Sequence, residues 1–515
     1  MSWVLAAPII IPFATAVLAF LFRRGPEGRW LSVAGSAGLL IASGFLMAEV
    51  LREGVVAAQM GQWAAPFGIT LVADLLSAVM VVITGITGLA VAIYALADVD
   101  EAKETLGFHA LYQVLLAGVC GAFLTGDLFN LYVWFEVMLI SSFGLLILGG
   151  KREQLDGGIK YVTLNLVSTI LFLSAVGLLY GMTGTLNMAD LHGAVQQVDN
   201  PGLLIVIAIM FMIAFGVKAA VFPLFFWLPA SYHTPAFAVS AIFAGLLTKV
   251  GVYSLIRVFT LIFTTDVAYT HTILLWVAGF TMVTGVLGAA AMNDFRRILS
   301  FHIISQIGYM ILGLALFTPL AIVGAVFYIV HHIIVKANLF LVAGVARRIA
   351  GSTDLSAIGG LYKTAPLLGL LFLIPAFSLA GFPPLSGFWA KYVLVKASLD
   401  AEAYWIAAVA LIVGLLTIYS MTKIWGAAFW KPHPEGLSPK LTALTARDRA
   451  ALLVPITSLA ILTCIIGFFP EPFVVFAERS AEQLLDPTEY VVAVLGEMPD
   501  IATDPADVAQ LEAVE

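Results

Sequence analysis

The stretch Lys218-Ala-Ala-Val-Phe-Pro-Leu-Phe-Phe-Trp-Leu-Pro229 contains two prolines, Pro223 and Pro229, inside a long apolar run. Proline lacks the backbone N–H and its ring clashes with the preceding helical turn, so a helix passing through this stretch must break. A second stretch of the same kind, Gly381-Phe-Pro-Pro-Leu-Ser-Gly-Phe-Trp-Ala-Lys391, follows later in the chain. Broken backbone at membrane depth is tolerated only against protein or a water-filled cavity. Because a lysine stands beside each break, the two stretches predict broken membrane helices along a polar path.

The composition supports a membrane location for both stretches. Of the 515 residues, 61% are hydrophobic and only 11% are charged, against roughly 25% charged in soluble domains. Apolar runs long enough to cross a bilayer recur along almost the whole chain, about fourteen in all. They lie near residues 3–22, 30–51, 70–96, 106–126, 128–149, 161–182, 203–228, 236–260, 271–291, 298–317, 321–345, 366–396, 403–428 and 451–475. An all-α polytopic membrane protein is therefore expected.

The two breaks fall in the seventh and twelfth of these spans. They lie five spans apart, and an odd separation reverses the direction in which the chain crosses the membrane. Corresponding broken helices in oppositely oriented halves are typical of inverted-repeat transporters. We therefore expect two inverted five-helix repeats, spans 4–8 and 9–13, each with a broken helix. Two unrelated proline kinks are the alternative.

This repeat predicts five regions along the chain. They are an N-terminal three-helix region (1–105), a first half-channel repeat (106–260), a second, inverted half-channel repeat (271–430), a cytoplasmic loop with the last transmembrane helix (431–476), and an acidic C-terminal tail on the outer side (477–515). The tail is expected to be solvated, with packing on a neighbouring subunit as the alternative.

Lysine and arginine gather in alternate loops. These residues are Arg23, Arg24 and Arg29 after span 1, Lys151, Arg152 and Lys160 after span 5, Arg296 and Arg297 after span 9, Arg347, Arg348 and Lys363 after span 11, and Lys431, Lys440, Arg447 and Arg449 after span 13. Basic loops face the cytoplasm, so both termini are expected outside. The loop 97–105, where one lysine stands among four acidic residues, fits this pattern less well. The net charge of −7 gives no sign of nucleic-acid binding.

Five charged residues lie inside spans or at their breaks. They are Glu136, Lys218, Lys249, Lys336 and Lys391. A charge at the bilayer centre costs at least about 2.5–3.5 kcal/mol, so such residues pair with one another or line a wet path. A pair formed by Glu136 and Lys218 would have protonation states that depend on each other, which suits a proton relay.

Histidines accompany one of these lysines. His332 and Lys336 are four residues apart and so share a helix face. Histidine titrates near neutral pH, which makes His332 a candidate proton carrier, whereas His331 is interpreted as packing. No third ligand stands at a convincing spacing for a metal, and no metal or cofactor is expected. His302 and Gln306 share another helix face and are weaker candidates for the proton relay. Their side chains either hold water or hydrogen-bond neighbouring helices.

Other polar residues have simpler interpretations. Arg257, Lys396 and Lys423 lie near span ends, where long basic side chains extend to the surface. Asp127 stands at a helix start and is expected to cap it. The segment 231–234 lies at the cytoplasmic end of the first break. It has two interpretations, a proton entry or an ordinary loop.

Four segments carry a resemblance to a known family. They are Leu-Tyr-Val-Trp-Phe-Glu136-Val-Met, Gly-Val-Lys218-Ala-Ala-Val-Phe-Pro-Leu-Phe-Phe-Trp-Leu-Pro, Ser-Phe-His-Ile-Ile-Ser-Gln-Ile-Gly-Tyr and His-His-Ile-Ile-Val-Lys336. They resemble the antiporter-like subunits of respiratory complex I and of Mrp-type multisubunit sodium/proton antiporters, over nearly the whole chain. The Phe-Glu-Val-Met-Leu-Ile-Ser-Ser version of span 5 and the tail Leu-Leu-Asp-Pro-Thr-Glu-Tyr-Val-Val-Ala-Val-Leu-Gly are most similar to Mrp D subunits.

The resemblance implies a role for each buried charge. Glu136 would pair with Lys218 in one half-channel, Lys249, His332 and Lys336 would carry protons across the centre, and Lys391 would be the terminal site of the second half-channel. It also implies a subunit of a hetero-oligomeric complex in the bacterial plasma membrane, surrounded by lipid, with H⁺ and Na⁺ as the transported ions. The sodium pathway is not placed by the resemblance.

Three functions compete at this point. The leading one is a proton-translocating subunit of a secondary Na⁺/H⁺ antiporter, rather than an enzyme. The second is a pumping subunit of a complex I or membrane-bound hydrogenase relative, where redox energy drives the same relay. The third is a structural scaffold, which the intact charges in both halves disfavour. An isolated channel is also disfavoured, because ion selectivity filters use carbonyl or acidic rings rather than amines.

Overall fold

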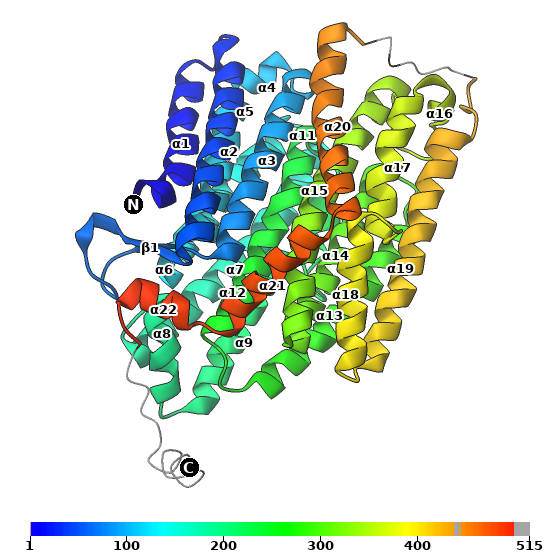
Figure 1. Cartoon of the computed structure of the whole chain (residues 1–515). Coiled ribbons are helices and arrows are strands. Elements are labelled where there is room, and N and C mark those ends of the chain that lie inside the picture. Colours follow the sequence, from blue (N-terminus) through cyan, green and yellow to red (C-terminus); the bar gives the residue numbers. More distant parts are fainter. Residues whose placement is uncertain (1, 437–440, 442–443, 499–515) are drawn as a thin grey trace.

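The chain folds into a tall bundle of helices (Figure 1). The computed structural model describes residues 2–436, 441 and 444–498. The helices of the N-terminal half are α1 (Ser2–Leu21), α2 (Glu27–Glu53), α3 (Leu75–Asp98), α4 (Glu101–Thr105), α5 (Phe108–Leu124), α6 (Leu128–Ile147), α7 (Arg152–Thr183), α8 (Met188–Ala194), α9 (Pro201–Ala219), α10 (Trp227–Ser231), α11 (Phe237–Ile242) and α12 (Thr248–Leu261). Those of the C-terminal half are α13 (Val267–Ala291), α14 (Phe295–Leu316), α15 (Pro319–Ala350), α16 (Leu361–Thr364), α17 (Pro366–Ala380), α18 (Ser386–Asp400), α19 (Tyr404–Ile424), α20 (Ala446–Phe468), α21 (Glu471–Leu485) and α22 (Thr488–Leu495).

Membrane-spanning helices dominate the described part of the chain. Twelve helices there are long and apolar enough to cross a membrane, and α5 and α17 are shorter apolar helices. The π-helical segment η3 (Phe243–Leu247) joins α11 and α12 into one of these spans, and a second one, η4 (Trp425–Trp430), extends α19. The prediction of an all-α polytopic membrane protein is thus confirmed.

A small hairpin is the departure from a purely helical fold. Strands β1 (Val56–Gln59) and β2 (Thr70–Ala73) pair antiparallel between α2 and α3, with Val56 opposite Ala73. The short segments η1 (Met60–Gln62) and η2 (Val195–Gln197) are single 3₁₀ turns. The hairpin segment is too short and too rich in turn residues to form another span, so its backbone groups pair with each other.

The two breaks have the same backbone geometry. After α9, Ala220 adopts a left-handed conformation with φ 61°, and the Val221 N–H donates to the Gly216 carbonyl oxygen at 3.0 Å. After α17, Gly381 does the same with φ 89°, and the Phe382 N–H donates to the Phe377 carbonyl oxygen at 2.9 Å. This arrangement closes a helix C-terminus by satisfying its last carbonyls. The third residue after each left-handed position is a proline, Pro223 or Pro384.

Other corresponding features of the two halves lie at opposite ends of the bundle. Asp127 caps α6 and pairs with Asn187 beside α8, while Asp294 caps α14 and pairs with Asp354 near α16. Figure 1 places α8 at the lower end and α16 at the upper end. The helices that follow, α7 and α15, are both 32 residues long. These matches support the inverted repeat over two unrelated kinks, and the capping role predicted for Asp127 holds.

The C-terminal helices differ from the predicted solvated tail. Helix α21 lies diagonally across the bundle, and α22 follows it beside α8 and β1 (Figure 1). Ser480 and Leu484 are buried, and Glu489 Oε1 accepts a hydrogen bond from the Val55 N–H at 2.9 Å. The prediction is therefore wrong for residues 477–495, because α21 is amphipathic and buries its apolar face. Residues 499–515 lie outside the described part of the chain.

The innermost spans carry the predicted charges. In their most apolar stretches, 94% of the residues of the α11–α12 span and of α14 are buried, as are 89% of those of α15, against 44% for α1. Lys249 lies on α12, His302 on α14, and His332 and Lys336 on α15. The bundle thus shields these groups behind an outer layer of apolar helices.

Candidate functional site

The first part of the site lies where α6, α7 and α9 meet. The Lys218 amine donates to the Asn165 carbonyl oxygen at 3.4 Å and to Thr169 Oγ1 at 3.3 Å. It also lies 5.4 Å from the centre of the Phe135 ring, a cation–π contact. Glu136 lies within electrostatic range of Lys218, but the described residues contain no direct ion pair between them. Glu136 Oε1 is buried without a hydrogen-bond partner there.

A small cavity adjoins the Lys218 amine. It offers about 20 Å³ to the centres of water molecules, and Tyr161, Asn165 and Trp227 are among its lining residues. One water needs roughly 10–15 Å³ of such space, so the cavity is large enough for a single water. A water in this cavity would give Lys218 a partner to which a proton can pass.

The centre of the site contains two amines and an imidazole. Lys249 donates to the carbonyl oxygen of Ala244 in the π-helical segment η3, and Lys336 donates to the Leu299 carbonyl oxygen at 3.1 Å. Neither lysine is exposed, and each lies within electrostatic range of the other. His332 lies within range of both, and its two ring nitrogens are buried without hydrogen-bond partners among the described residues. The structure thus brings these predicted residues together from α12 and α15.

The second half contributes Lys391 at its break. The Lys391 amine donates to the Ala380 carbonyl oxygen at 3.1 Å and lies 4.9 Å from the centre of the Tyr309 ring. His302, on α14, is within electrostatic range of Lys336 and Lys391, and both of its ring nitrogens are buried and unpartnered in the described structure. His302 therefore occupies the gap between the central lysines and Lys391. In the sequence His302 is only a weaker candidate, because a neutral histidine within an apolar run often only packs.

His331 does more than pack. Its Nδ1 lies 2.8 Å from Ser386 Oγ, and Ser386 Oγ lies 2.9 Å from Ser378 Oγ. These contacts tie α15 to both sides of the second break, α17 and α18. The interpretation of His331 as a packing residue is therefore incomplete, because the histidine hydrogen-bonds the break beside Lys391.

The four buried lysines share one property. Among the described residues, no carboxylate lies within ion-pair distance of any of them, and each instead donates to a backbone carbonyl oxygen. A carbonyl accepts from either an ammonium or a neutral amine. These sites therefore suit groups that change protonation state better than groups held permanently charged.

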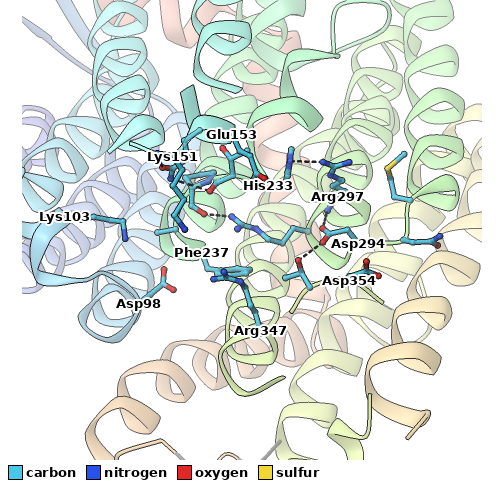
Figure 2. Close-up of a pocket in the computed structure, with 18 residues that line it drawn as sticks. Asp98, Lys103, Lys151, Glu153, His233, Phe237, Asp294, Arg297, Arg347 and Asp354 are labelled. Carbon is cyan, nitrogen blue, oxygen red and sulfur yellow. Dashed lines mark hydrogen bonds between the residues drawn. The ribbon is translucent and has the colours of Figure 1, made fainter. Parts of the chain in front are cut away.

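A large vestibule opens at the end of the bundle that carries the basic loops. It has a volume of about 570 Å³ and lies between the two repeats. Figure 2 shows its charged lining, contributed by Asp98, Lys103, Lys151, Glu153, His233, Asp294, Arg297, Arg347 and Asp354. Arg296 anchors the loop after α10 by donating to the Pro235 carbonyl oxygen at 2.6 Å. Its lining carries both positive and negative side chains, so the vestibule is a polar surface between the two repeats.

His233 lies on the wall of this vestibule. Its Nδ1 donates to the Pro229 carbonyl oxygen at 2.8 Å, so Nε2 faces the Arg297 guanidinium at 3.4 Å. Burial and the positive charge of Arg297 hold the pKa of His233 below its ordinary value. The Ser356 side chain similarly lowers the pKa of Asp354 by hydrogen bonding. No cluster of metal-ligating side chains occurs in the described residues.

Arg257 contradicts its sequence-based interpretation. It is 4% exposed, and its guanidinium lies 2.6 Å from the carboxylate of Asp74, which is also buried. It does not extend to the surface, because α3 and α22 cover the end of α12. Lys396 does extend outward, in an exposed pair with Asp400.

Known proteins match this architecture closely. Residues 125–417 match the family described as "NADH:quinone oxidoreductase/Mrp antiporter, TM". The chain is 49% identical to the D subunit of the Na⁺/H⁺ antiporter of Alkalihalophilus pseudofirmus and 41% identical to that of Bacillus subtilis, each over 95% of this chain and 99% of the relative. A chain in the Mrp complex of Dietzia sp. DQ12-45-1b superposes with a TM-score of 0.89 at 34% identity, over 96% of this chain and 100% of the other. The chain therefore belongs to the transmembrane family shared by NADH:quinone oxidoreductases and Mrp antiporters, and within it to the Mrp-type D subunits.

Proposed function

We propose that this antiporter subunit moves protons along Glu136, Lys218, Lys249, His332, Lys336 and Lys391, and that this movement is coupled to Na⁺ export by the complex that contains it. The observation that carries the proposal is the series of buried amines that lack ion-pair partners and alternate with unpartnered imidazoles. A proton can rest on an amine and pass to the next group when a neighbouring charge changes. His302 joins the proposed relay between Lys336 and Lys391.

Glu136 is proposed to switch the first half-channel. Its carboxylate favours the protonated form of Lys218 when the two approach, and burial favours the neutral amine when they separate. The structure has them in electrostatic range but without direct contact, which is the separated arrangement in this scheme. A change of a few ångströms at α6 would therefore alter the affinity of Lys218 for a proton.

The driving force is proposed to be the proton gradient. The relatives named as Na⁺/H⁺ antiporter subunits favour this source over redox energy. The redox-driven alternative uses the same family of subunits, but nothing in this chain favours it. A scaffold role would leave several buried charges without use at a cost of about 2.5–3.5 kcal/mol each.

The surroundings of the subunit follow from this proposal. It would work within a hetero-oligomer of Mrp-type subunits, in the plasma membrane of a bacterium and in contact with lipid. The face with the basic loops would point to the cytoplasm and both termini outward. Protons would then approach from the face that carries α8 and α22.

The test is Na⁺-dependent dissipation of a pH gradient in inverted vesicles that contain the whole complex. Glu136→Gln and Lys218→Met should abolish the response while assembly on a native gel is unchanged. Lys160→Met is the matched control, because Lys160 is exposed and pairs only with Asp156 on its own helix. Full activity in both relay variants would overturn the proposal. Wild-type vesicles that ignore Na⁺ would favour the redox-driven alternative.

A further inference from the structure

The face of α12 that carries Lys249 continues as a polar line toward α22. Tyr253 and Arg257 follow at intervals of four residues, so the three side chains share one helix face. All three are buried, with exposures of 0%, 3% and 4%. The relay proposed above uses Lys249 only, and the remainder of this line has no part in it.

A buried ion pair ends the line. Asp74 Oδ2 lies 2.6 Å from an Arg257 nitrogen, and Asp74 Oδ1 accepts a hydrogen bond from the Ser77 N–H at 2.8 Å. Removing two charges from water costs several kcal/mol each, and a well-packed apolar pair would often be as stable. Stability alone therefore does not account for an ion pair at this depth.

The Tyr253 hydroxyl connects the ion pair to the interior. It lies 2.9 Å from Ser77 Oγ and accepts a hydrogen bond from Arg257 at 3.3 Å. It donates to the Phe123 carbonyl oxygen at 2.8 Å. A tyrosine hydroxyl both donates and accepts, so it can take a proton on one side and release one on the other.

A hollow on the surface adjoins the start of α3, where Asp74 precedes the first helical residue. It has a volume of about 270 Å³, and its lining includes Leu75, the residue that follows Asp74, together with Glu482, Asp486 and Glu489. The Tyr490 ring covers Arg257 at 5.1 Å from the guanidinium carbon to the ring centre. The residue next to Asp74 thus lines a hollow that holds three carboxylates and the Arg479 guanidinium, while Asp74 itself is 1% exposed.

We propose that Asp74, Ser77, Tyr253 and Arg257 form the proton access route between the α22 face and Lys249. The inference rests on the proposed function, because it presumes that Lys249 carries protons. A proton arriving at Asp74 neutralises its carboxylate. Asp74 then releases this proton to the Ser77 hydroxyl and regains its charge. The hydroxyls of Ser77 and Tyr253 each accept one proton and release another, and the neutral amine of Lys249 becomes an ammonium. The first transfer requires the Ser77 hydroxyl to turn toward Asp74, which bonds the Ser77 N–H in the structure, and the last requires the Tyr253 hydroxyl to leave the Phe123 carbonyl oxygen.

The last transfer requires a movement of Lys249. In the structure its amine bonds the Ala244 carbonyl oxygen, on the side of the lysine away from Tyr253. Swinging the side chain along the helix axis by about one helical turn would bring the amine toward the tyrosine hydroxyl. Lys249 would then face the access route in one rotamer and the central relay in the other, and the π-helical segment η3 supplies the acceptor for the second.

The test removes a single oxygen atom. Tyr253→Phe keeps the ring and deletes the hydroxyl, and Tyr112→Phe is the matched control. The Tyr112 hydroxyl is equally buried and donates to the Gly88 carbonyl oxygen at 2.6 Å, away from the proposed route. Na⁺-dependent proton flux should fall at least about tenfold in Tyr253→Phe, because positioned proton-transfer groups contribute large rate factors. The control should keep its flux.

A second readout separates proton transfer from a structural role. The ratio of flux in H₂O to flux in D₂O should rise in Tyr253→Phe, where proton transfer becomes limiting, and stay at the wild-type value in the control. Ser77→Ala gives the same two readouts if Tyr253→Phe does not assemble. Wild-type flux in an assembled variant would overturn the route. If Lys218→Met in the same vesicles also kept its flux, the proposed function itself would fail instead.

Discussion

Replacing Gly387 with alanine should force apart α17 and α18, the two helices that flank the second break. Gly387 lies at the start of α18, and a Cβ there would lie 1.8 Å from the Ser378 carbonyl oxygen and 2.8 Å from His331 Nε2. Ordinary van der Waals contact begins at 3.4 Å, so α17 and α18 would have to separate by roughly 1.6 Å, the difference between 3.4 and 1.8 Å. Helix backbones cannot yield this distance locally.

The cost can be worked out from the contacts at this point. Overpacking costs about 1–3 kcal/mol. Separation of the two helices also breaks two hydrogen bonds, between Ser386 and Ser378 and from the Gly387 N–H to Ser378, at about 1 kcal/mol each. The better helix propensity of alanine returns at most about 1 kcal/mol. The expected loss of stability is therefore about 2–4 kcal/mol.

The assay combines denaturant unfolding of the purified complex with Na⁺-dependent proton flux. Gly387→Ala should unfold at a lower denaturant concentration and lose flux, because Lys391 follows the break by one helical turn. Gly177→Ala is the control, since a Cβ at Gly177 meets nothing within 4 Å. An assembled Gly387→Ala complex with wild-type unfolding and flux would refute this account of the break.

Three further outcomes follow from the same structure. Lys336→Met should stabilise the complex by about 1 kcal/mol while it stops transport, because it removes a buried charge that has one hydrogen bond. The exposed control is Lys160→Met. A Lys336→Met complex that is no more stable than this control would contradict the prediction. Arg297→Gln should let the pKa of His233 rise. Because native His233 binds fewer protons than the unfolded chain, stability falls as the pH drops through its titration range, and the variant should lose less in acid unfolding curves. Glu489→Ala should destabilise the contact of α22 with Val55, the residue before β1, by about 1 kcal/mol. Denaturant unfolding measures this change, and an unchanged unfolding midpoint would contradict it.

The buried charges could be predicted because each is an anomaly in its own sequence context. A lysine inside an apolar run, such as Lys249 or Lys336, is costly unless it is used, so the run itself marks the candidate. His302 and His331 carry no such mark, since a neutral histidine within a span often only packs. Arg257 was misread because distance from a span end does not reveal whether another helix covers that end.

The membrane class, the spans and the two breaks could all be predicted from the order of residues along the chain. These follow from hydropathy and from the missing N–H of proline, which are properties of short segments. The sequence also indicated the inverted repeat, because the count of spans between Pro223 and Pro384 fixes their relative direction.

Which buried groups meet could be seen only once the helices were packed together. The approach of Lys249 to His332, the place of His302 before Lys391, and the ion pair of Arg257 with Asp74 all join helices far apart in the chain. Such contacts depend on how helices pack and rotate against one another, and hydropathy does not encode that rotation. The diagonal course of α21 also depends on helix packing. The sequence shows that α21 has an apolar face, but it does not show which helices bury that face.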